Sequence, residues 1–197
     1  MTRLPSIWRP LSVGAIKKEL SGFNEWVLCG GHSVALIVGK DTRAHGDIDV
    51  GVFRSRLRDC LYTLGSERVF LCLRGVHHEW DGGNVPEEVH DIWIADKERE
   101  YWVLQIMVFD DDAERVYYRR DRRISWSKKS HAIEVDGIRV LNPFITVLFK
   151  SNKPALEERE IHDIMQLIEN KPAPITGADH LKHERVKKHD ATGQNVS

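Results

Sequence analysis

The chain of 197 residues is long enough to enclose one hydrophobic core, and its 41% hydrophobic and 30% charged residues are typical of a folded globular protein. Lysine and arginine total 29 against 30 for aspartate and glutamate, so the net charge of −1 argues against a protein whose main task is to coat nucleic acid. The three cysteines, Cys29, Cys60 and Cys72, form no CxxC pair and exclude a disulfide framework or a cysteine zinc site.

The same composition indicates a compartment. The opening stretch MTRLPSIWRP lacks the apolar core of a signal peptide, and no apolar run approaches the ~20 residues that span a bilayer. Because the cysteine usage also fits a reducing environment, the sequence predicts a soluble cytoplasmic protein.

Predicted helices and strands alternate in the first half of the chain. Apolar residues at roughly helical spacing predict a helix within 11–23, with Gly22 as its stop signal. Apolar runs, helical stripes and glycine stops then predict strand 25–29, helix 32–39, strand 47–53, helix 54–65 and strand 68–74.

The second half is richer in strands. Three glycines and a proline predict a loop over 75–88. The predicted elements that follow are strands 89–96, 101–110 and 115–120, a hairpin over 131–143 with Asp136-Gly137 at its tip, and helices 143–150 and 155–170. The last helix is amphipathic, and its apolar side consists of Leu156, Ile161, Ile164, Leu167 and Ile168.

This order of elements predicts an α/β or α+β fold, a mixed β-sheet with packed helices, as a single domain over residues 1–170. Residues 171–197 are polar and poor in apolar side chains, which predicts a flexible C-terminal tail.

Two glycines separate the strand 25–29 from the helix that follows. Gly30 and Gly31 carry no Cβ, so a phosphate could approach their backbone amides, and the positive end of the helix dipole would attract it. The Ser33 hydroxyl could bond a phosphate oxygen or cap the helix. The pattern predicts an anion cradle, although a Gly-Gly pair alone is more often a tight turn.

Two aspartates enter the next strand. Asp47 and Asp49 stand two residues apart, so in a strand they would point to the same side, with Cα atoms roughly 6.5–7 Å apart. Mg²⁺ is commonly bound by one or two carboxylates together with substrate phosphates. The alternative is that both carboxylates face water. Between the two motifs, Arg43 could contact a triphosphate or fix its own loop.

The segment from Gly30 to Asp49, with GG, a short helix and then G-x-x-T-R-x-H-x-D-I-D, resembles the nucleotidyltransferase superfamily, in particular the small aminoglycoside and lincosamide nucleotidyltransferases. A looser resemblance covers residues 15–170. It rests on Trp93 and on the segments 117–124, 142–153 and 159–163.

The resemblance implies an enzyme of nucleotidyltransferase-like fold that moves a nucleoside monophosphate from an NTP to an acceptor hydroxyl and releases pyrophosphate. It implies Mg²⁺, as one or two ions, on Asp47 and Asp49, with the NTP held by Gly30, Gly31, Ser33, Arg43 and Lys150. ATP is one such donor, and the base is left open.

Relatives usually carry a third carboxylate on a later strand, for the second metal ion or the acceptor proton. The polar residue in the middle of strand 101–110 is Gln105, which cannot act as a base. Asp91 on the preceding strand and Asp110 at the strand end are the alternatives, and we rank Asp91 first. A third alternative is that neither serves.

Two charged residues near the end of the domain have open roles. Lys150 could reach a phosphate or simply complement the dipole at the end of its helix. Asp163 is predicted mainly as a structural partner of Lys150 or Arg159.

Three functions follow from these residues. The first is nucleotidyl transfer to a small hydroxylated molecule, such as an antibiotic. The second is a toxin-like enzyme that modifies RNA or protein, favoured if Arg119, Arg120, Arg122 and Arg123 ring a pocket. The third is a degenerate nucleotide-binding protein without turnover. The sequence leaves the acceptor and the oligomeric state open.

Overall fold

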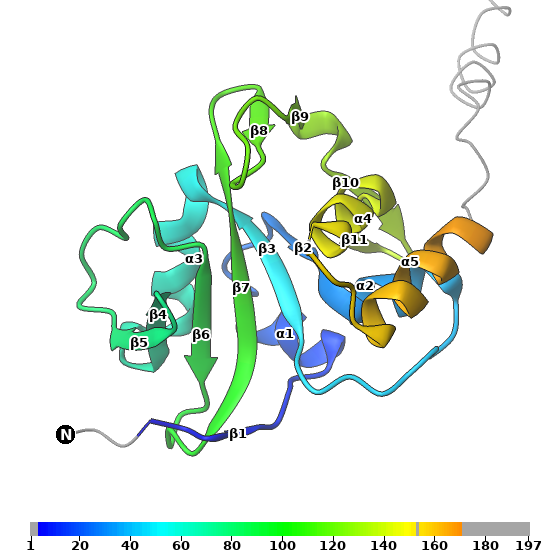
Figure 1. Cartoon of the computed structure of the whole chain (residues 1–197). Helices are drawn as coiled ribbons and strands as arrows, with labels where there is room; N and C mark the ends of the chain where they lie inside the picture. Colours follow the sequence, from blue (N-terminus) through cyan, green and yellow to red (C-terminus); the bar gives the residue numbers. More distant parts are fainter. Residues whose placement is uncertain (1–3, 153, 171–197) are drawn as a thin grey trace, which may run out of the picture.

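The strands form one mixed sheet. The computed structural model of the protein describes residues 4–152 and 154–170, and within these residues eleven strands pair along the path β10-β11-β2-β3-β7-β6-β4-β5, with β1 and β8 also on β7 and β9 on β8 (Figure 1). Their bounds are β1 Ile7–Trp8, β2 Trp26–Leu28, β3 Asp49–Phe53, β4 Val69–Leu73, β5 Val76–Glu79, β6 Asp91–Ala95, β7 Tyr101–Asp111, β8 Arg115–Tyr117, β9 Ser125–Ser127, β10 Ala132–Val135 and β11 Ile138–Leu141. β3 runs parallel to β7 and antiparallel to β2, so the predicted mixed sheet is confirmed.

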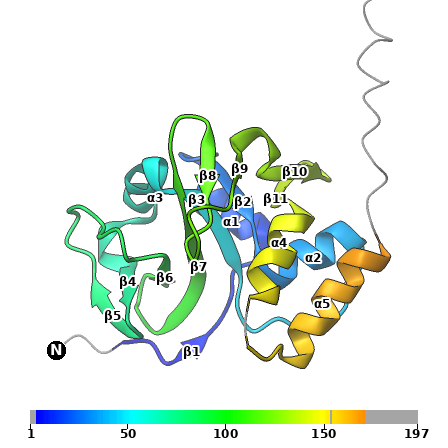
Figure 2. The ribbon, with the colours of Figure 1, turned by 45° about the horizontal axis from the view of Figure 1, so that its top comes forward.

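Helices pack on both sides of this sheet. Their bounds are α1 Val13–Glu19, α2 Gly30–Val38, α3 Leu57–Leu64, α4 Pro143–Ser151 and α5 Glu158–Glu169. α1 and α3 contribute to the larger hydrophobic core. Figures 1 and 2 show α2, α4 and α5 gathered as a separate group beside β2 and β11, and α5 contacts both α2 and α4. None of the helices in residues 4–152 and 154–170 is both long and apolar enough to cross a membrane.

Local sequence signals set several of these boundaries. The helix predicted after Gly30-Gly31 ends at Val38, and Gly39 caps it in the left-handed conformation, with φ 76°. Pro143 opens α4, and the Asn142 side chain accepts a hydrogen bond from the Phe144 amide. Asp136 and Gly137 both have positive φ at the hairpin tip, as a two-residue turn of this composition requires.

Three strands were missed by the predictions. Residues 75–88 are not all loop, because β5 pairs with β4 there. This edge strand is short and mostly exposed, so it lacks the apolar alternation that marks a strand. β1 and β9 were not predicted, being two and three residues long and defined by the neighbours they pair with. The tail predicted for 171–197 lies outside the described residues.

The buried face of the final helix differs from the predicted one. α5 buries Glu160, Asp163 and Leu167, whereas Ile161 and Ile168 from the predicted apolar side are about half exposed (47% and 51%). The amphipathic spacing therefore predicted the helix correctly and its buried face in part, since Leu167 is buried as expected but Ile161 and Ile168 are not.

Alternation along the central strands gives the sheet two different faces. Val50 on β3 and Ile106 on β7 point into the core shared with α1 and α3. Asp49 and Gln105, which are paired in the register of β3 and β7, point to the opposite face. The polar residues of the predicted site thus share the side of the sheet away from the larger core.

Candidate functional site

The glycine turn joins β2 to α2 at the edge of this polar face. Gly30 is the first residue of α2 and has φ 63°, a conformation that favours glycine. The N-cap residue is Cys29, and its side chain makes no capping hydrogen bond. Ser33 is fully buried, and its hydroxyl donates to the Gly30 carbonyl oxygen at 2.8 Å. The prediction that Ser33 caps the helix was wrong, because the N-cap is Cys29 and the Ser33 hydroxyl stabilises the turn from within; contact with a phosphate stays a prediction.

The space that the glycines leave is taken up by side chains of the following loop and strand. A Cβ on Gly30 would lie 2.0 Å from Oδ2 of Asp49. A Cβ on Gly31 would lie 2.3 Å from Nδ1 of His45 and 2.5 Å from Nη2 of Arg43. Real Cβ atoms do not approach this closely, so both glycines are needed to bring the aspartate motif and the loop before it against the turn.

The two aspartates differ in environment. β3 begins at Asp49, so Asp47 lies in the segment before the strand and is exposed, whereas Asp49 is partly buried. Burial, together with the neighbouring negative charges of Asp47 and Asp91, raises the pKa of Asp49 to about 7, and the positive charge of Lys150 opposes this shift. The predicted pair is therefore electrostatically coupled, although not through the strand geometry that the spacing suggested.

The third carboxylate of this group is Asp91. It is the first residue of β6, and its Oδ1 accepts a hydrogen bond from Nε2 of Gln105 at 3.3 Å. Its Oδ2 accepts one from Nη1 of Arg119 at 3.0 Å. Gln105 also stands beside Asp49 in the register of β3 and β7, so its side chain lies on the strand between the two carboxylates.

Asp110, the alternative third carboxylate, belongs to a different cluster. It accepts hydrogen bonds from Nε of Arg54 and Nε2 of His90, and these hydrogen bonds lower its pKa in spite of the burial that would raise it. Arg54 also donates to the backbone carbonyls of Pro86, Glu87 and Val89. Asp110 therefore anchors the 86–90 segment, and the structure favours Asp91 as the partner of Asp49.

The loop residue Arg43 and the helix residue Lys150 meet at one carboxylate. Arg43 donates from Nε and Nη2 to the two oxygens of Asp163 at 2.9 and 2.7 Å, and Nζ of Lys150 lies 2.7 Å from Oδ2. The Asp163 side chain is completely buried. The predicted Lys150–Asp163 pair is confirmed, whereas Arg159 pairs with Glu157. Of the two roles left open for Arg43, the structure shows that of fixing its own loop.

The carboxylates suit a divalent cation in their chemistry. Asp49 lies against a glycine with no Cβ, and its pKa is raised first by burial and then by negative neighbours whose charge a bound cation would neutralise. Within residues 4–152 and 154–170, however, no three His, Cys, Asp or Glu side chains already converge as a ready metal site. β3 and β6 are separated by β7, which places their backbones about 9–10 Å apart.

Two histidines, His32 and His45, lie beside the glycine turn. The rings of His32 and His45 lie 4.4 Å apart, and Nε2 of His45 is buried without a hydrogen-bond partner among the residues that the structure describes. A cavity of about 580 Å³ lies beside them and the 41–45 loop. The glycine at position 31 makes room for the His45 ring against the turn.

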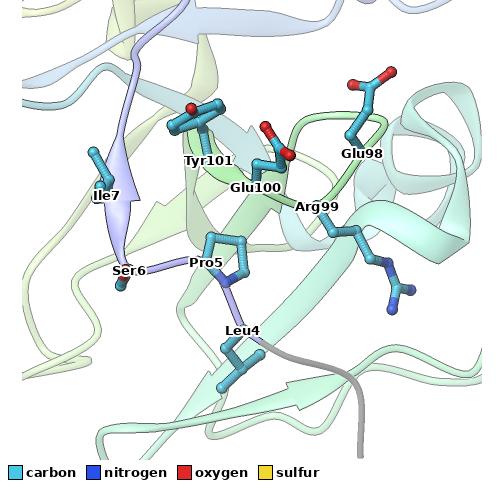
Figure 3. Close-up of a pocket in the computed structure, with 8 residues that line it drawn as sticks. All are labelled: Leu4, Pro5, Ser6, Ile7, Glu98, Arg99, Glu100 and Tyr101. Carbon is cyan, nitrogen blue, oxygen red and sulfur yellow. The ribbon is translucent and has the colours of Figure 1, made fainter.

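A second cavity, of about 520 Å³, is separate from the site. Figure 3 shows it between the N-terminal segment 4–7 and the turn 98–101, and none of the predicted site residues lines it. Tyr101 at its edge precedes Gln105 by four residues, or about 13 Å along β7.

The four arginines of the basic cluster predicted for an RNA or protein acceptor contact separate partners. Arg119 binds Asp91, Arg120 donates to the Asn152 carbonyl oxygen, and Arg123 pairs with Asp121. Arg122 is 68% exposed, near Asp110.

Comparison with solved structures identifies the fold. The chain is similar to a lincosamide antibiotic adenylyltransferase with lincomycin bound, at 17% identity and a TM-score of 0.54 over 81% of this chain and 98% of that one. ANT(2")-Ia in complex with adenylyl-2"-tobramycin matches at 17% identity and a TM-score of 0.49, over 82% of this chain and 90% of that one. A Megavirus polyadenylate synthase matches at 14% identity and a TM-score of 0.44, over 93% of this chain and 33% of that one. Neither a family model nor a curated protein matches the sequence. The chain has a nucleotidyltransferase-like fold.

Proposed function

We propose that the protein is a nucleotidyltransferase that moves a nucleoside monophosphate from an NTP to a hydroxyl group of a small molecule. The observation that carries the proposal is the set of three interacting carboxylates, Asp47, Asp49 and Asp91, next to the uncapped glycine turn at the start of α2. Such an arrangement binds opposite parts of one ligand, because backbone amides attract phosphate oxygens and carboxylates attract the cation that accompanies them.

The residues divide the work as follows. Asp47 and Asp49 would hold Mg²⁺, which supplies charge neutralisation at the phosphates when bound. The amides at Gly30 and Gly31 would face the phosphate chain. Lys150 acts on Asp49 electrostatically and is proposed to face the triphosphate from α4, whereas Arg43 holds the 40–46 loop through Asp163.

Asp91 is the proposed general base. The acceptor oxygen forms a bond to the α-phosphorus of the NTP while the bond from that phosphorus to the pyrophosphate oxygen breaks. The hydroxyl proton passes to Asp91, and pyrophosphate leaves with the electron pair. Positioning and charge neutralisation supply most of the acceleration of phosphoryl transfer, and a general base typically adds 10²–10⁴-fold.

The proposal is tested by pyrophosphate release. The full chain is incubated with Mg²⁺, each of ATP, GTP, CTP and UTP, and acceptors that include lincomycin and tobramycin. These two compounds appear in the solved structures of similar fold, and they enter the panel as trial acceptors. We expect turnover with one NTP, its abolition by Asp49→Asn, and a loss of 10²–10⁴-fold with Asp91→Asn.

Asp110→Asn is the matched control. It removes one carboxylate of the same sheet that is bound to Arg54 and His90 rather than to the site, so a correctly folded D110N protein should retain turnover. Equal losses in D91N and D110N would contradict the role given to Asp91. Absence of turnover with every NTP and acceptor would contradict the enzyme.

One observation favours a second function, a nucleotide-binding protein without turnover. Both oxygens of Asp91 are occupied, by Gln105 and Arg119, and Gln105 is not a base. Tight binding of an NTP in calorimetry, with no pyrophosphate released, would support this function against the first.

A further inference from the structure

Arg119 reaches the carboxylate group from a well-anchored turn. It follows Tyr118, which is 1% exposed and packs edge-on against Phe149 at 5.0 Å between ring centres. Backbone hydrogen bonds from Tyr118 to Ile124 at 2.9 Å and from Asp121 to Tyr118 at 3.1 Å close the turn. The backbone of Arg119 is therefore fixed, while its long side chain extends over Phe149 toward Asp91.

The contact at its end is a weak form of an arginine–carboxylate pair. Among the residues that the structure describes, only Nη1 of Arg119 makes a hydrogen bond, to Oδ2 of Asp91, and this carboxylate is 33% exposed. Arg43 offers an internal comparison, because it grips a fully buried carboxylate with two parallel hydrogen bonds. Two-point pairs are stronger and more specific than single ones, so the Arg119 contact is the exchangeable one.

The location of this contact gives the exchange a consequence. Gln105 stands beside Asp49 in the sheet and donates a hydrogen bond to Asp91, so a divalent cation attracted to these carboxylates approaches an oxygen group already bound to a guanidinium. Mg²⁺ binds carboxylate oxygens at about 2.0–2.1 Å. A carboxylate that is bound so closely has little space and little remaining negative charge for a second cation. A guanidinium released from Asp91 is well suited to phosphate oxygens.

We propose that Arg119 is a positioning residue that competes with the divalent cation for Asp91. Arg119 holds Oδ2 of Asp91 while the site is without ligand, and this oxygen passes to the cation as the phosphates of an NTP take Arg119, which leaves Oδ1 for the acceptor proton. The cation alone then binds weakly and binds more tightly together with the nucleotide. This inference rests on the proposed function for its purpose, but the competition itself is measurable without turnover.

The test is direct titration of the full chain with Mn²⁺ in the absence of nucleotide. Arg119→Gln should bind Mn²⁺ roughly fivefold more tightly than the wild type, which is the size of one partly exposed ion pair. Arg123→Gln is the matched control for loss of a positive charge, since Arg123 lies four residues later, 91% exposed and paired with Asp121, and it should leave the affinity unchanged. Arg119→Lys provides a second variant in which positive charge is kept, and its affinity should fall between the two.

The double variant Asp91→Asn, Arg119→Gln separates competition from a general charge effect. If Arg119 acts through Asp91, removing Arg119 from the D91N protein should bring no gain in Mn²⁺ affinity. A gain of the same size in D91N would overturn the proposal, as would an unchanged or weakened affinity in R119Q. A lack of turnover in the wild type would contradict the proposed function and leave this titration unaffected.

Discussion

Replacing Asp163 by asparagine removes the charge that holds Arg43 and Lys150 together, with little change in shape. The wild-type carboxylate receives two hydrogen bonds from Arg43 and lies 2.7 Å from Lys150, with no exposed surface of its own. Removing one partner of a fully buried pair costs about 3–5 kcal/mol, and exposed pairs are worth about 0–1 kcal/mol. Because Arg43 and Lys150 are 24% and 16% exposed, we expect a loss of about 2–3 kcal/mol in the free energy of unfolding.

The assay is equilibrium unfolding in urea at pH 7. Asp121→Asn, which removes a carboxylate from the exposed Arg123 pair, is the matched control and should produce no measurable loss. A D163N protein as stable as the D121N protein would refute the reasoning that Asp163 ties the 40–46 loop to α4 and α5.

The same experiment has a predicted pH dependence. Burial raises the pKa of Asp163, but the hydrogen bonds from Arg43 and Lys150 outweigh it, and the pKa falls below its usual 3.8. A lowered pKa in the folded state means that the stabilisation is present above about pH 4 and is lost as the pH falls through the folded-state pKa. The difference between wild type and D163N should therefore shrink in acid.

Two further predictions concern the turn and the carboxylates. Gly30→Ala should cost at least about 1 kcal/mol of stability and abolish turnover, because its Cβ displaces Asp49. Gly39 also has a positive φ, but a Cβ there would meet open space, so Gly39→Ala should retain turnover. Equal activity of the two variants would contradict the packing argument. Because the pKa of Asp49 is raised to about 7, the wild type should lose stability as the pH rises from about 4 to 7, by as much as about 4 kcal/mol, while Asp49→Asn should not. Thermal unfolding at pH 8 should show Mg²⁺ restoring the wild type and having no such effect on D49N, and identical responses would argue against a cation at Asp49.

The order of elements was predictable because periodicity and turn residues report local structure directly. Gly39, Asn142-Pro143 and Asp136-Gly137 each determine a boundary through the backbone conformation or hydrogen bond that they provide. β1 and β5 were not predictable in this way, since they exist only through pairing with β7 and β4, which single-sequence patterns do not report.

The site was predicted in part for the same reason. Gly30 and Asp49 could be paired from the sequence because the motif places a glycine turn and a carboxylate on successive strands, and the structure brings them into contact. The partners of Asp91 could not be identified from the sequence. Gln105 and Arg119 come from later segments, and they reach Asp91 through the sheet register and through a distant turn.

The orientation of α5 shows how the site constrains the fold. A helix with this spacing would normally bury Ile161 and Ile168, and a rotation that did so would carry Asp163 away from the interior. The structure instead buries Asp163 against Arg43 and Lys150 and leaves Ile161, Met165 and Ile168 about half exposed. Exposing apolar side chains is unfavourable, and the contacts that Asp163 makes with Arg43 and Lys150 offset part of that cost in this orientation. The loop in question carries Arg43 and His45 against Gly31 and leads directly to Asp47 and Asp49, so the rotation of the last helix is coupled to the position of the carboxylates.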